Sequence, residues 1–222
     1  MLRKTKSAII LAAGAGLLAS SCGIASASVT QPPAATRAGA VSIRDWRTSA
    51  VEYADAHWAW SDENDKEPRV GNGANQYDFQ CAEFVARSLA AAGLIPGLNA
   101  DAPQSDYNYF KARNSKTYDL LLISDSPGHR SLYDFLRDFG IGTDIGDKPG
   151  RAQPGDVVVS FDKSGSGPVH TGLIAQAGDG TRQPVVDAHN NARLRCTLDR
   201  YSKDTNEPSI PHIVKIAPIH SS

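Results

Sequence analysis

The stretch NQYDFQCAEFVARSL, residues 75–89, holds the strongest structural signal in the chain. It turns from polar to apolar at Cys81, after which Phe84, Val85 and Leu89 recur at the offsets of a helix face. Gly93 then supplies a stop signal for that helix. The pattern therefore predicts a helix that carries a cysteine in its first turn.

A cysteine at the start of a helix suits covalent catalysis. The positive end of the helix dipole favours the thiolate, which is the nucleophilic form of the side chain. Asp78 or Gln80 can accept hydrogen bonds from the first free backbone N–H groups. Two other interpretations of Cys81 stay open, because a small buried hydrophobic residue and one half of a disulfide also fit this position.

The N-terminus has the pattern of a secretory signal. Basic residues within 1–6 precede an apolar segment, residues 8–19, that is too short to cross a bilayer comfortably. Ala25-Ser26-Ala27 provides the small residues that signal peptidase requires. We predict a signal peptide over residues 1–27 and a protein that is secreted or held in the cell wall. The alternative is a lipid anchor on Cys22, which follows a sequence similar to a lipoprotein box.

The mature chain is weakly acidic. Without residues 1–27 it has 20 Lys plus Arg against 24 Asp plus Glu, a formal charge of −4. We therefore expect no nucleic-acid partner and, since no later segment is long and apolar enough to span a bilayer, no stable membrane insertion after cleavage. Residues 28–43, rich in proline and small residues, are expected to be a flexible linker, and residues 44–218 a single monomeric domain.

Two cysteines remain after cleavage, Cys81 and Cys196. In a secreted protein such a pair suggests one disulfide, which would consume the candidate nucleophile. Cys196 lies in the alternating segment RLRCTL, where Leu194, Cys196 and Leu198 would share one face of a strand. Cys196 can therefore equally be a core residue.

Helical periodicity is found in the first half of the chain. Residues 43–60 carry an aromatic stripe that includes Trp46 and Tyr53. We interpret the stripe as core rather than as a carbohydrate-stacking surface, because this spacing is the ordinary signature of a buried helix face. A later helix is expected to start after Ser131, as its cap, and to end at Gly140.

The second half of the chain has the character of β-strands. Turns rich in glycine and proline separate five apolar segments. They are residues 156–161, 168–176, 185–189, 193–198 and 210–216. Helices followed by an antiparallel meander indicate the α+β class, with the N-terminal helices packed on the sheet.

A histidine on one of these strands complements the cysteine. His170 follows a glycine-rich turn, and the next strand presents Asp187 and His189 on one face because side chains alternate. A cysteine nucleophile needs a base, and the base needs a third group that fixes its tautomer and supports its charge. His170 is the candidate base, and either Asp187 or His189 the third group.

Several blocks resemble one known family. They are AVEYA with Trp58 (50–58), QCAEFV (80–85), GDVV (155–158), HTGLI (170–174) and AHNN (188–191). In this order, from about residue 44 to 216, the chain is similar to the bacterial putative amidase domain family, which itself resembles the NlpC-like and CHAP groups of cysteine amidohydrolases and peptidases. The resemblance implies a circularly rearranged papain-like fold, with the cysteine on a helix and the histidine on a neighbouring strand.

The resemblance also implies roles for residues. Cys81 matches the nucleophile and His170 the base; His189 matches this family's third position, whereas Asp187 falls where the NlpC-like and CHAP groups place a polar partner. Family members usually have Asp-Cys-Thr-Asn-Phe where this chain has QCAEF, which keeps the nucleophile. The implied activity is hydrolysis of amide bonds in peptidoglycan or peptides, without a cofactor.

The oxyanion of such a reaction would be held by the backbone N–H of Cys81, aided by Gln80 or Tyr77. Two alternatives are a non-catalytic secreted binding domain with a Cys81–Cys196 disulfide, and a zinc site built from Cys81, His170, His189 and Asp187. The zinc alternative lacks the closely spaced ligand pairs of common zinc motifs, so we expect no metal.

Overall fold

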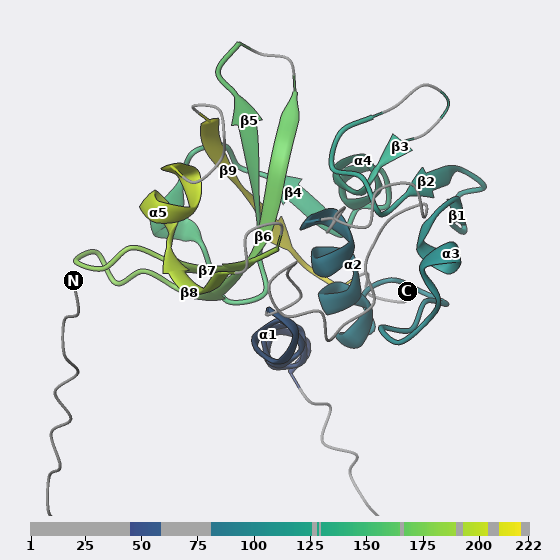
Figure 1. The fold of residues 1–222 in the computed structure, drawn as a ribbon, viewed down its shortest axis with the longest axis horizontal. Coiled ribbons are helices and arrows are strands. Elements are labelled where there is room, and N and C mark those ends of the chain that lie inside the picture. Colours follow the sequence, from purple (N-terminus) through teal and green to yellow (C-terminus); the bar gives the residue numbers. More distant parts are fainter. Residues whose placement is uncertain are drawn as a thin grey trace, which may run out of the picture. The chain divides into compact units, whose positions relative to one another are not determined.

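Helix α2, Cys81–Ala91, is the buried centre of the domain and packs on helix α1, Trp46–His57, and strand β6, Pro168–Gln176 (Figure 1). The structure, a computed structural model, describes residues 45–58, 81–125, 128, 130–164, 167–189, 193–203 and 209–218, all of which belong to the unit Ser42–Ser222. The predicted signal peptide, the linker and Cys22 lie outside the described residues, as do Tyr77, Asp78 and Gln80.

Three shorter helices and one turn of 3₁₀-helix complete the helical elements of the described residues. They are α3 (Gln104–Tyr107), α4 (Leu132–Asp138), α5 (Leu198–Lys203) and the 3₁₀ turn Pro149–Arg151. None of the helices described has the length and apolar character needed to cross a membrane.

The main sheet has six strands in the order β4-β9-β5-β6-β7-β8, and every neighbouring pair is antiparallel. Besides β6, its strands are β4 (Gly142–Asp144), β5 (Val157–Asp162), β7 (Val185–Ala188), β8 (Arg193–Thr197) and β9 (Ser209–Ile216). A small second sheet joins β1 (Phe110–Lys111), β2 (Thr117–Asp119) and β3 (Arg130–Ser131), with β2 and β3 parallel. The predicted α+β class with an antiparallel sheet is confirmed.

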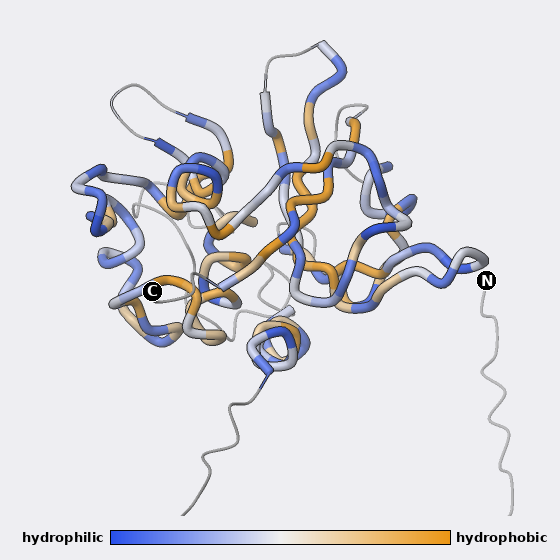
Figure 2. The backbone as a smooth tube through the Cα atoms, turned by 180° about the vertical axis from the view of Figure 1, so that it is seen from behind, coloured by the Kyte–Doolittle hydropathy of each residue, from blue (hydrophilic) through white to orange (hydrophobic). Residues whose placement is uncertain are grey.

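Side chains of the sheet alternate between two apolar cores. Val157, Val159 and Leu173 face the core that contains α1, α2 and α4, whereas Val158 and Ile174 face the smaller core under α5. Figure 2 shows the hydrophobic residues concentrated along the strands and the hydrophilic residues at the tips of the turns. The sheet therefore has helices on both faces, and α2 lies on the larger side.

The predicted helix signals are confirmed where the structure describes them. Gly93 has φ +72°, its N–H bonds to the carbonyl of Ala90, and the N–H of Leu94 bonds to that of Leu89, which is a Schellman ending for α2. Ser131 caps α4 in a reciprocal capping box with Asp134.

The aromatic stripe of α1 belongs to the core, as expected. Ala50, Val51 and Ala54 are buried, and Trp46 and Tyr53 pack against the same cluster. The helix itself is shorter than the predicted residues 43–60, because Asp45 caps it by accepting a hydrogen bond from the N–H of Arg47.

The prediction for the strand that contains Cys196 is wrong in part. Leu194 is 44% exposed, whereas Cys196 and Leu198 are buried. The reason is a change of register between β7 and β8, where Arg195 adopts φ +50° and interrupts the alternation of side chains. Leu198 begins helix α5 instead of continuing the strand.

A buried carboxylate joins the two ends of the domain. Asp156, fully buried, accepts hydrogen bonds from the Arg47 guanidinium of α1 (3.1 Å), the N–H of Gln153 (2.8 Å) and the N–H of Ile216 in β9 (3.1 Å). The ammonium group of Lys215 also bonds to it. The Asp156 of the GDVV block thus has a structural role, because it fixes α1 and β9 at the start of β5.

Candidate active site

Cys81 lies at the first residue of α2 and is only 4% exposed. The backbone N–H groups of Thr171 in β6, of Ala82 and of Cys81 itself lie close enough to its sulfur to favour the thiolate. The contact with Thr171 is the important one, because it holds the sulfur beside the backbone that leads directly from His170. The helix start and the histidine strand are therefore brought together.

The Cys81 side chain is a protonated thiol in the folded protein, not a thiolate. Burial raises the pKa of Cys81 to about 11, although the three N–H groups act in the opposite direction. The helix position favours the thiolate, as the sequence indicated, but desolvation of a charge at a buried sulfur outweighs this. At neutral pH the thiol keeps its proton, so any nucleophilic use of Cys81 needs a base.

His170 is half-buried in β6, opposite Ser160 of β5. The imidazole ring stacks on the ring of Tyr201 in α5, with centroids 5.1 Å apart and planes at 19°. Two residues further on, Gly172 allows β7 to approach closely, since an added Cβ would lie 2.7 Å from a methyl group of Val186. The HTGLI block thus combines a packed imidazole with a tight contact between strands.

His189 lies against the cysteine helix and within electrostatic range of His170. It is fully buried, and its ring stacks on Phe84 of α2 at 5.7 Å. Burial, and then the charge of His170, lower the pKa of His189 to about 3. His189 is therefore a neutral imidazole at neutral pH, within electrostatic range of His170.

Asp187 has different partners. Its Oδ1 accepts a hydrogen bond of 2.6 Å from the N–H of Arg195, and its carboxyl group also interacts with Asp55 of α1. The guanidinium of Arg195 binds Asp55 through both carboxylate oxygens, at 2.8 and 2.5 Å. Burial first, and then the interaction with Asp55, raise the pKa of Asp187 to about 7. Asp187 and His189 do share the helix-facing side of the β7 segment. The described partners of Asp187, however, are Asp55 of α1 and Arg195 of β8.

Sequence reasoning missed Tyr201 and Ser160. Tyr201 is 1% exposed, Ser160 is fully buried, and neither hydroxyl oxygen has a hydrogen-bond partner among the described residues. Desolvation raises the pKa of this phenol well above its usual value, and the charges of Cys81 and Cys196 act in the same direction. No local pattern marks Tyr201, because the α5 segment reads as part of a polar connection.

The acidic Glu83 next to the nucleophile is neutralised. Its carboxylate accepts hydrogen bonds from Arg87 Nε (2.7 Å) and from the Gln104 amide (3.1 Å), and both charged residues are buried. Arg87 also stacks over the ring of Tyr107 at 4.4 Å. This internal pair anchors α2 to the α3 segment.

The geometry supports neither the disulfide nor the zinc interpretation of Cys81 among the described residues. Cys81 and Cys196 are both buried thiols, and the structure contains no disulfide between them. No group of three or more His, Cys, Asp or Glu side chains in the described ranges is arranged to hold a metal ion. The two predicted helpers of the oxyanion, Gln80 and Tyr77, lie outside the described residues.

Comparison with known proteins identifies the family. The family model described as "putative amidase domain" matches residues 44–210. The chain belongs to the putative amidase domain family. No curated protein and no solved structure matches the chain, so the specific likeness to papain-like, NlpC-like or CHAP proteins stays a prediction. For the amidase domain, membership indicates hydrolysis of amide bonds.

Proposed function

We propose that this amidase domain is an exported cysteine amidohydrolase, with Cys81 as nucleophile, His170 as general base and acid, and His189 as the third group. The observation that supports it best is the contact between the sulfur and the N–H of Thr171, because it holds the thiol beside the histidine strand at the start of a buried helix. The family indicates an amide bond as the target.

The reaction begins with proton transfer, since burial leaves the Cys81 thiol protonated. His170 takes the proton, and the thiolate attacks the carbonyl carbon of the amide to form a tetrahedral oxyanion near the start of α2. The C–N bond then breaks, His170 gives its proton to the leaving amine, and a thioester remains on Cys81. Water, deprotonated by His170, hydrolyses the thioester and restores the thiol.

His189 fits the third position better than Asp187 does. An imidazole kept neutral by burial can accept a hydrogen bond from the protonated His170 ring, which would stabilise that charge. Asp187 is held neutral below about pH 7 and is occupied by Arg195 and Asp55. Tyr201 would support the base by fixing the plane of its ring.

The proposed substrates are amide bonds of peptidoglycan or of peptides, which is consistent with the predicted signal peptide and with the family. The test compares the wild type with Cys81→Ala on purified cell-wall fragments and on acetylated peptides, with products read by mass spectrometry. Cys196→Ala is the matched control, because it removes the other buried thiol.

Loss of the nucleophile should lower product formation by at least about a thousandfold, whereas Cys196→Ala should stay close to wild type. A peptide product that still forms at the wild-type rate in Cys81→Ala would refute cysteine catalysis. An acyl-enzyme mass on Cys81 in the wild type would support it directly.

A further inference from the structure

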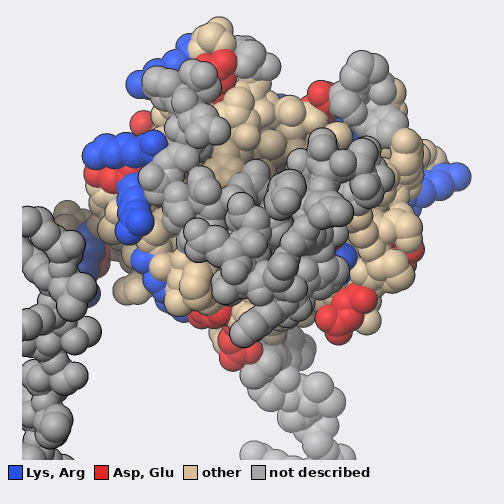
Figure 3. Space-filling model, in the orientation of Figure 1, with Lys and Arg blue, Asp and Glu red and all other residues tan. Residues whose placement is uncertain are grey.

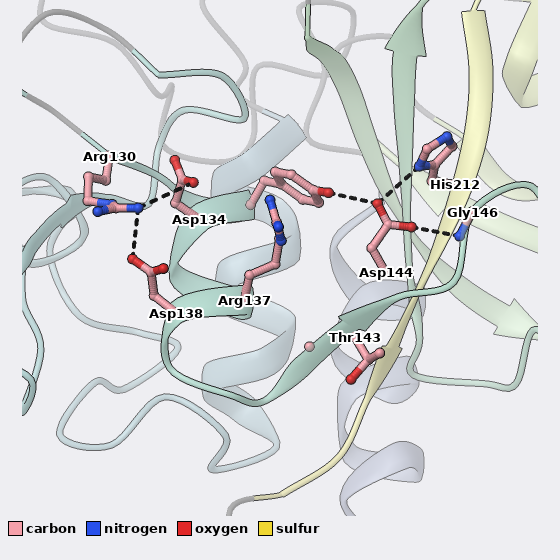
Figure 4. Close-up of a pocket in the computed structure, with 10 residues that line it drawn as sticks. Arg130, Asp134, Arg137, Asp138, Thr143, Asp144, Gly146 and His212 are labelled. Carbon is pink, nitrogen blue, oxygen red and sulfur yellow. Dashed lines mark hydrogen bonds and ion pairs between the residues drawn. The ribbon is translucent and has the colours of Figure 1, made fainter.

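A polar pocket opens between α4, β4 and β9 (Figure 4). Its volume is about 750 Å³. Tyr133 and Arg137 of α4 form one wall, and Asp144 of β4 and His212 of β9 form the other. The close approach of α4 to β4 at Gly142, where an added Cβ would lie 2.8 Å from Leu136 Cβ, sets the base of the pocket.

The pocket lies on the same sheet face as the candidate nucleophile. Thr171, Val159 and His212 are direct cross-strand partners on β6, β5 and β9. Val159 faces the core that contains Cys81, and Thr171 contacts the sulfur. Because neighbouring strands are about 4.8 Å apart, His212 lies about 10 Å along the sheet from the Thr171 anchor.

The carboxylates of the pocket are already occupied. Asp144 accepts hydrogen bonds from the Tyr133 hydroxyl (2.7 Å) and the N–H of Gly146 (2.7 Å), and its Oδ2 lies 3.0 Å from His212 Nδ1. Burial raises its pKa, but the bonds from His212, Tyr133 and Gly146 outweigh this and lower it, so the group stays an anion. Arg130 holds Asp138 at 3.0 Å and Asp134 at 3.7 Å on the other side.

Arg137 is the cation of this pocket that remains available. Its guanidinium lies over the Tyr133 ring at 5.2 Å, and within the described ranges it makes no ion pair. Figure 4 shows its side chain in the space between the Arg130 group and Asp144. A guanidinium held on an aromatic ring presents a planar fork of donors, which matches a carboxylate.

We propose that this pocket is a specificity subsite in which Arg137 binds a carboxylate of the substrate. The inference rests on the proposed function for the identity of the cleaved bond, but not for the binding itself. An extended peptide advances about 3.3 Å per residue. The straight line of about 10 Å passes Val159, which is buried, so the path over the surface is longer and the carboxylate lies at least three residues from the scissile amide. The carboxylate can come from a chain terminus or from an acidic side chain.

The test measures binding to the full chain carrying Cys81→Ala, which cannot turn over. The probes are an acetylated alanine tetrapeptide with a free C-terminal carboxylate, the same peptide as C-terminal amide, and the amide with glutamate at the third position. Affinity is measured by calorimetry and the site by NMR shifts of the Arg137 side chain and His212. The two acidic probes distinguish a terminal from a side-chain carboxylate.

At least one acidic probe should bind about tenfold or more tightly than the neutral amide, with shifts at Arg137 and His212. Adding Arg137→Met, which keeps the packing on Tyr133, should remove this preference, and Arg137→Lys should keep part of it. The control is Arg182→Met, since Arg182 is exposed and pairs with Asp179 in a surface turn.

Equal affinity for acidic and neutral probes, no measurable binding, or a preference that survives Arg137→Met would overturn the proposal. Activity of the wild type separates the two claims. If neither acidic probe is cleaved but the Arg137-dependent preference is present, the subsite stands and the proposed reaction fails. If the wild type cleaves all three peptides equally well and their affinities are equal, the reaction stands and the subsite fails.

Discussion

Replacing Asp187 with asparagine should change how stability depends on pH. The folded-state pKa of Asp187 is raised to about 7 from the ordinary 3.8, and the side chain is fully buried. The folded state therefore binds one more proton than the unfolded state between about pH 4 and 7, so the stability present at low pH is lost as pH rises through this window. A difference of about three pK units corresponds to about 4 kcal/mol. Because Asp55 titrates together with Asp187, we expect about 2 to 4 kcal/mol.

The asparagine side chain of the Asp187→Asn variant would imitate the neutral acid. Its amide oxygen can accept from the N–H of Arg195, and its NH₂ group can face Asp55 without adding a second negative charge. Asp187→Asn should therefore match the wild type below about pH 4, and should exceed its stability by about 1 to 2 kcal/mol at pH 5 and by about 2 to 4 kcal/mol at pH 8.

The assay is urea denaturation followed by tryptophan fluorescence, at pH 5, 6, 7 and 8, with Asp199→Asn as an exposed control on α5. The histidines contribute equally to both chains and cancel in the difference. A difference between Asp187→Asn and wild type that does not vary from pH 5 to 8 would show that Asp187 is ionised throughout and that the assigned proton is absent.

Three further predictions concern the site and its support. The folded-state pKa of His189 is lowered to about 3 from the unfolded value of 6.5, so the neutral ring stabilises the fold above pH 6.5 and this stabilisation is lost as pH falls. His189→Gln does not titrate, so at pH 4 it should avoid about 3 kcal/mol of the loss in unfolding free energy that the wild type shows in denaturant titrations. Tyr201→Phe should keep kcat/KM within about tenfold because the ring still stacks on His170, whereas Tyr201→Leu should lower it further and shift the pH–rate profile; equal effects in both variants would argue against stacking as the cause. Arg87→Met should cost about 3 to 5 kcal/mol by leaving Glu83 buried without its partner, and adding Glu83→Gln should restore part of this, which thermal denaturation of the single and double variants can show.

Local signals in the sequence predicted the elements that carry the site. The start of α2 at Cys81 and its ending at Gly93 follow from side-chain period and from a glycine in the left-handed region, both of which act within a few residues. The strand with His170 and the shared face of Asp187 and His189 follow from alternation. These features need no knowledge of what packs against them.

The features that were missed depend on contacts between distant segments. The pKa of Cys81 is set by burial under the sheet, which no pattern around residue 81 reveals. The partner of Asp187 lies far away in the chain, at Asp55, and the bulge at Arg195 that joins them breaks the expected alternation. Tyr201 reaches His170 only because α5 folds back over the sheet.

The face of the molecule in Figure 3 carries basic and acidic side chains in mixed positions around its rim, and neither sign forms a continuous patch among the residues described there. Such a surface offers no long-range attraction to a polyanion. The proposed binding of a carboxylate by Arg137 therefore depends on a single group in its pocket and not on the charge of this face.

The contacts of Asp156 determine when the domain can complete its folding during synthesis. Its distant partners come from residue 47 and from residues 215 and 216, so the bonds that close the domain cannot form until residue 216 has been synthesised. A nascent chain stopped before Lys215 would keep the Arg47 partner of this carboxylate but lack Lys215 and the N–H of Ile216. Truncations that remove Lys215 and Ile216 should therefore yield protein that aggregates, whereas extensions beyond residue 218 should be tolerated.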